Sequence, residues 1–139
     1  MRAVRERTLW RPGILIVLAL WAVSLALPAM SVEGGPVLRG IDVLRRGWQA
    51  SDAGVYAWFA NPLFLAACAA GWRGLRGPAF VLAGAACVLA LTSFATRGVA
   101  AASGAAVPVF VFHAGFYLWL ATHFAMLLSC LPRRVTAPS

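Results

Sequence analysis

The chain reads GPAFVLAGAACVLALTSFAT over residues 77–96, a stretch of 20 residues without a charged side chain. Three more uncharged stretches cover residues 12–32, 53–72 and 98–132, and they contain 21, 20 and 35 residues. A helix of about 20 apolar residues crosses the ~30 Å hydrocarbon core of a bilayer. Lipid offers the backbone no hydrogen-bond partner, which favours helices over open strands. The sequence therefore predicts four membrane-spanning helices.

The overall composition points to the same class of protein. Of the 139 residues, 62% are hydrophobic and only 12% are charged, and the mean hydropathy is +0.82. A soluble domain has about 25% charged residues. This composition argues against a disordered chain, a disulfide-stapled secreted domain and a conventional soluble enzyme.

We expect an all-α fold, a polytopic four-transmembrane-helix bundle that forms a single membrane domain over residues 1–139. The helices are predicted at about residues 13–30, 56–72, 79–96 and 109–131. The glycine- and alanine-rich stretch before the last helix is predicted to be a flexible connector.

The second and third predicted helices are joined by only residues 73–77, so they should be antiparallel neighbours. Small residues on both helices should let their backbones approach closely. Asn61-Pro62 interrupts the second helix. Pro62 has no N–H to donate to the carbonyl of Trp58, which predicts a kink.

The distribution of arginine predicts the orientation, because cytoplasmic loops carry an excess of positive charge. With the N-terminus inside, the cytoplasmic face holds eight arginines, at positions 2, 5, 7, 11, 73, 76, 133 and 134. The other face holds four, at positions 39, 45, 46 and 97. We therefore expect a bacterial inner-membrane protein with both termini in the cytoplasm. The alternative is a cleaved signal peptide ending at Ser24-Leu-Ala26.

The first outer loop carries an apolar stripe at helical spacing. Val37, Ile41, Leu44 and Trp48 recur at i, i+4, i+7 and i+11. An amphipathic interfacial helix over about residues 36–48 is therefore predicted. The stripe is either a surface for a partner protein or a structural lid over the bundle.

A polar residue from each predicted helix falls in the outer third of the bilayer. These residues are Ser24, Asn61, Thr92, Ser93 and His113. Together they are a candidate polar pocket, and the alternative is a layer of interhelical hydrogen bonds.

The sequence predicts no catalytic, cofactor or metal site. The predicted spans contain no Asp, Glu, Lys or Arg, which proton-coupled carriers typically need. Cys68, Cys87 and Cys130 stand alone, as small buried hydrophobes usually do. His113 and His123 lie ten residues apart, or about 15 Å along one helix, too far to bind the same metal.

Gly47-Trp48, residues 57–63 (AWFANPL) and residues 117–121 (YLWLA) resemble those of small uncharacterised four-helix bacterial inner-membrane proteins. The resemblance implies an architecture and no activity.

Three functions are compatible with these features. The first is a non-enzymatic membrane protein that binds or stabilises a partner, as an accessory subunit or an immunity-type protein. The alternative is a small oligomeric transporter or channel that uses the polar layer. An enzyme acting on lipid or quinone around His113 and Asn61 ranks last. The expected partners are the lipid bilayer, another membrane or envelope protein, or a second copy of the chain, and not nucleic acid.

Overall fold

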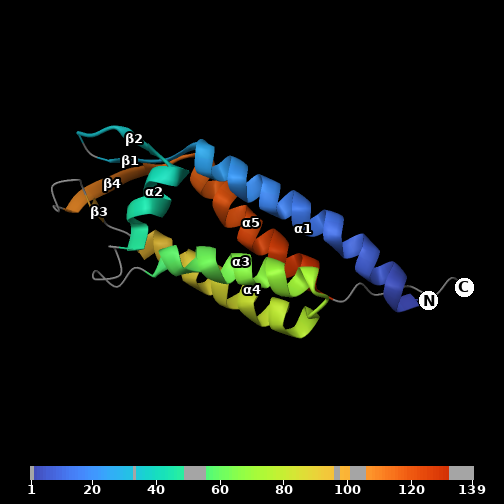
Figure 1. Cartoon of the computed structure of the whole chain (residues 1–139). Coiled ribbons are helices and arrows are strands. Elements are labelled where there is room, and N and C mark those ends of the chain that lie inside the picture. Colours follow the sequence, from blue (N-terminus) through green and yellow to red (C-terminus); the bar gives the residue numbers. More distant parts are fainter. Residues whose placement is uncertain (1, 33, 49–55, 96–97, 101–105, 132–139) are drawn as a thin grey trace, which may run out of the picture.

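The computed structural model describes residues 2–32, 34–48, 56–95, 98–100 and 106–131. Most of these residues are helical, and the long helices α1, α3, α4 and α5 lie alongside one another (Figure 1). A small sheet and the short helix α2 occupy one end of this helical layer, and the turn between α3 and α4 lies at the other.

The element bounds follow the chain in order. The helices are α1 (Arg2–Ala26), α2 (Gly40–Arg46), α3 (Ala60–Trp72), α4 (Arg76–Leu91) and α5 (Ala114–Cys130). Single 3-10 turns extend two of them, η2 (Ala57–Phe59) before α3 and η3 (Thr92–Ala95) after α4. The strands are β1 (Pro28–Val32), β2 (Val37–Arg39), β3 (Gly98–Ala100) and β4 (Ala106–Phe112).

The sheet was not expected from the sequence, and it corrects three predicted helix boundaries. Its strands pair antiparallel in the order β2-β1-β4-β3. The first helix ends at Ala26 because the chain turns into β1 at Pro28, which has no N–H to continue the helix. Residues 106–112 form a strand, in keeping with their β-branched and aromatic side chains. The short helix begins at Gly40 and not at residue 36, because residues 37–39 pair with β1.

The prediction of a four-helix multi-pass membrane bundle is wrong. Among the described residues, only the stretch Arg76–Ala95, which joins α4 and η3, is long and apolar enough to cross a membrane. The other apolar helical stretches, Arg11–Ala26, Ala57–Trp72 and Ala114–Cys130, fall short of 18 residues. Two of the uncharged runs, 12–32 and 98–132, looked long enough because they include residues of the sheet. The fold is instead a compact helical domain with a small antiparallel sheet.

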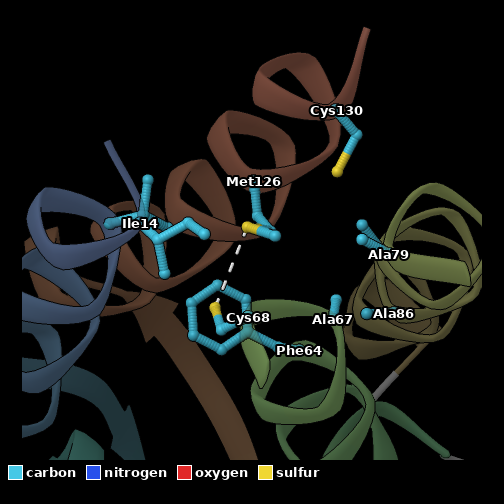
Figure 2. Close-up of a cluster of buried hydrophobic side chains, with 10 residues drawn as sticks. Ile14, Phe64, Ala67, Cys68, Ala79, Ala86, Met126 and Cys130 are labelled. Carbon is cyan, nitrogen blue, oxygen red and sulfur yellow. Dashed lines mark hydrogen bonds between the residues drawn. The ribbon is translucent and has the colours of Figure 1, made fainter. Parts of the chain in front are cut away.

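Helices α3 and α4 form the most extensive helix pair. They run antiparallel, as predicted, around a turn in which Gly74 adopts a φ of 81°. Alanines fill the space between the helices, and Ala67, Ala79, Ala83 and Ala86 are almost completely buried. Figure 2 shows Ala67 of α3 and Ala79 and Ala86 of α4 near the bulkier Phe64 and Met126. Small side chains therefore let the two backbones approach closely.

Candidate functional site

Asn61 joins three helices through its side-chain oxygen. Its Oδ1 accepts hydrogen bonds from the indole N–H of Trp21 on α1, at 3.1 Å, and of Trp119 on α5, at 2.8 Å. Asn61 itself lies on α3 and is buried. A single amide oxygen therefore uses both of its lone pairs to connect α1 and α5 to α3.

Pro62 lies in the first turn of α3 and does not interrupt the helix, and the nitrogen of the same amide binds the carbonyl that lacks its usual donor four residues later. Asn61 Nδ2 donates to the carbonyl of Trp58 at 3.0 Å. In a regular helix the backbone N–H of residue 62 would donate to this carbonyl, but proline has no N–H. The Asn-Pro pair thus supplies a substitute donor for the missing backbone bond.

His123 lies beside this junction in an aromatic setting. It is fully buried, and its ring centroid lies 4.6 Å from that of Trp119 and 4.9 Å from that of Phe64. Its Nδ1 is 2.8 Å from the Trp119 carbonyl, and because a carbonyl only accepts, Nδ1 carries the proton. No hydrogen-bond partner for Nε2 occurs in the described part of the chain.

His113 contacts the sheet and not the other candidate pocket residues. Its Nε2 lies 2.5 Å from the hydroxyl of Ser31 on β1, and its backbone N–H donates to the carbonyl of Ala29 at 2.8 Å. The sequence did not single out Ser31, because residues 28–32 were expected to belong to a helix and its end.

A serine bonded to a histidine is also the pair from which nucleophilic catalysis can start, provided that a third group orients the histidine. Asp42 carries the only carboxylate whose side chain the structure describes, and it accepts from the backbone N–H of Arg39 at 3.1 Å. The Ser31–His113 contact connects β1 to the start of α5.

The three predicted hydroxyl residues bond within their own helices. Ser24, Thr92 and Ser93 donate to the carbonyls three residues earlier, at 2.6, 2.6 and 2.5 Å. Within the described ranges, no hydrogen bond connects them to Asn61 or His113. A pocket shared by these five residues stays a prediction.

The predicted partner surface is divided between two elements. Val37 lies on the edge strand β2 and Trp48 follows α2, and each is more than half exposed. Ile41 and Leu44 are only half-buried. The carbonyl of Leu44 accepts from the Trp58 indole at 2.6 Å, which fixes α2 against η2.

Gly40 and Gly115 hold the sheet end of the molecule against the end of α1. A Cβ on Gly40 would lie 2.6 Å from the Ser24 carbonyl oxygen, and a Cβ on Gly115 would lie 2.6 Å from that of Pro28. Both positions therefore require glycine because of close backbone approach.

Two sulfur-containing side chains contact each other in the core. The Cys68 thiol donates to the sulfur of Met126 at 3.8 Å (Figure 2). No group of three or more His, Cys, Asp or Glu side chains able to hold a metal occurs in the described portion of the chain.

No known protein family, curated protein or solved structure matches the chain. The resemblance to small four-helix inner-membrane proteins therefore stays a prediction, and the proposals below depend on the geometry alone.

Proposed function

We propose that the chain is a non-enzymatic integral protein of a bacterial inner membrane that binds or stabilises a partner protein. The observation that carries the membrane assignment is the inverted distribution of side-chain size. Small residues occupy the space between α3 and α4, whereas several large apolar side chains of α4 are exposed.

Two large apolar side chains of α4 are mostly exposed. Val81 is 67% exposed and Val88 is 66% exposed. Monomeric soluble proteins rarely expose apolar patches larger than a few hundred Å². Lipid chains are as apolar as these side chains, so helices in a bilayer gain most by packing small residues against one another.

The anchor in this proposal is the stretch Arg76–Ala95. Its 20 residues extend over about 30 Å, the thickness of the hydrocarbon core. The side chains that pack toward α3 are mostly alanine, whereas Phe80, Val81 and Val88 are exposed. One face of this helix therefore binds protein and the other faces lipid.

The partner contact is assigned to α2 and the edge strand β2. Val37 and Trp48 offer exposed apolar surface there. An edge strand also presents unpaired backbone groups to which another chain can add. Asn61 and Ser31 use their polar atoms to hold the fold together, which supports a binding role more than a chemical one.

Two measurements on the full-length chain test this proposal. Carbonate washing of bacterial membranes should leave the chain in the pellet, and release of the chain would refute the membrane assignment. A photo-crosslinking residue at Val37 or Trp48 should give one discrete adduct with another protein, whereas the same residue at Val81 should give none. No adduct at either position, or only an adduct of twice the chain's mass, would refute a distinct protein partner.

A further inference from the structure

Basic and aromatic side chains gather at the turn between α3 and α4. Trp72, Arg73 and Arg76 are exposed there. The guanidinium of Arg11 on α1 lies over the Trp72 ring, 5.2 Å from its centroid. The turn is at the end of the molecule opposite the sheet (Figure 1). We call Arg11, Trp72, Arg73 and Arg76 the basic end.

The local backbone holds this group in place. Gly74 donates to Gly71 at 2.8 Å and Leu75 donates to Ala70 at 2.9 Å, which closes the C-terminus of α3. The positive φ of Gly74 is the conformation that this type of helix cap requires. The backbone that carries Arg73 and Arg76 is therefore fixed by the hydrogen bonds of this turn.

Acidic residues are few in this part of the sequence, and Glu6 is the one nearest to Arg11 along the chain. From residue 53 to residue 139 the chain contains no Asp or Glu. Arg76 begins the stretch proposed as the membrane anchor, so this end lies at the level of the lipid headgroups. Tryptophan is enriched at that level, and arginine is attracted to anionic lipid there.

We propose that the basic end binds the phosphate-bearing headgroups of anionic phospholipids. In this site the stacked Arg11 and Trp72 side chains lie beside Arg73 and Arg76. This inference rests on the proposed membrane location. The ligand is a lipid and not free phosphate, because exposed apolar side chains at Trp72 and Leu75 adjoin the arginines and suit the glycerol and acyl portion.

The test uses the purified full-length chain in mild detergent with equal amounts of phosphatidylglycerol and phosphatidylcholine, and native mass spectrometry counts the retained lipids. The wild type should retain phosphatidylglycerol preferentially. Each arginine near an anionic surface contributes roughly fivefold to binding. The R73Q/R76Q variant should therefore lose about 25-fold of the preference, and high salt should weaken the wild-type preference.

A matched control removes the same charge from the other end of the molecule. Arg45 and Arg46 are exposed on α2, and the R45Q/R46Q variant should keep the wild-type preference. An unchanged preference in R73Q/R76Q, or an equal loss in both variants, would overturn the proposal. Displacement of the lipid by millimolar glycerol phosphate would overturn it as well, since the site would then bind free phosphate.

The two proposals fail separately. Release of the wild type by carbonate counts against the membrane location. Retention of R73Q/R76Q in the carbonate pellet, with unchanged phosphatidylglycerol preference, counts against the basic end alone.

Discussion

Replacing Asn61 with leucine should remove the hydrogen-bonded junction between α1, α3 and α5. The leucine has a similar volume but no polar atom, so the indole N–H groups of Trp21 and Trp119 lose their partner together, whereas the carbonyl of Trp58 keeps the backbone N–H of Ala60. A buried group left without a hydrogen bond costs about 1–3 kcal/mol. Because these contacts are only partly buried, we take the lower half of that range for each group. For the two indole groups the expected loss is roughly 2–4 kcal/mol of unfolding free energy.

The assay is denaturant-induced unfolding in detergent, followed by tryptophan fluorescence and by circular dichroism. Trp119→Phe removes a single donor and leaves Asn61 Oδ1 with its bond from Trp21, so it should cost about 1 kcal/mol. The double variant N61L/W119F should be less destabilised than the sum of the single variants, because both remove the same bond. If Asn61→Leu lies within about 1 kcal/mol of the wild type, or if the two effects simply add, the junction does not stabilise the fold as argued.

Three other substitutions probe the contacts around the junction. Gly115→Ala would place a Cβ 2.6 Å from the Pro28 carbonyl oxygen, so thermal unfolding should show that the free energy of unfolding falls by about 2 kcal/mol or more. The control is Gly13→Ala, whose Cβ would have nothing within 4 Å, and its free energy of unfolding should stay unchanged or rise by up to about 1 kcal/mol. A wild-type melting curve for the Gly115 variant would contradict the close approach. Ser31→Ala should cost about 1 kcal/mol in chemical denaturation, because it leaves the cap of α5 without its bond to β1, and no loss would argue against that tie. His123→Phe should stay within about 1.5 kcal/mol of the wild type, because it keeps the aromatic contacts, and the Trp119 carbonyl that loses Nδ1 still accepts from the Thr122 hydroxyl. A larger loss in the same titration would mean that the hydrogen bonds of the imidazole contribute more than its aromatic packing.

The parts of the fold that follow from local chemistry could be predicted from the sequence. The short connection at residues 73–77 is compatible only with antiparallel neighbours, and α3 and α4 pack in this way. The carbonyl that Pro62 leaves without its usual donor was also predictable, because the loss depends on a proline and a residue four positions earlier. Both features depend on residues close together in the chain.

The sheet could not be predicted from hydropathy. Residues 28–32 and 106–112 are as apolar as the helices that they adjoin, and an uncharged run does not distinguish a strand from a helix. The available signal was local, in the proline at position 28 and the alternating valines and phenylalanines of residues 107–112. Counting residues between charges therefore missed the strands at residues 28–32 and 106–112, and it also missed that α1 begins at Arg2, among charged residues.

The hydrogen-bond partners of the polar residues could not be predicted from the sequence, because they lie far away along the chain. Asn61 lies 40 residues from Trp21 and 58 residues from Trp119, and nothing in the local pattern connects them. Ser31 and His113 are separated by 82 residues and meet only because β1 pairs with β4. Such contacts depend on which strands pair and how helices pack. The position of a residue along a predicted helix therefore did not indicate its hydrogen-bond partner.

On α4 the buried side chains are small and the exposed ones are large, so the stability of this helix depends on what surrounds it. Hydrophobic stabilisation scales with the apolar area removed from water, at about 25 cal/mol per Å². Ala79, Ala83 and Ala86 are almost fully buried, but each removes little area, whereas the larger Val81 and Val88 remain mostly exposed on the same helix. Close packing of alanines gives dispersion contacts in any solvent, but the valines are stabilised only when lipid, detergent or another protein covers them. The domain should therefore depend for its stability on an apolar environment around α4, and this dependence ties its packing to the proposed membrane location.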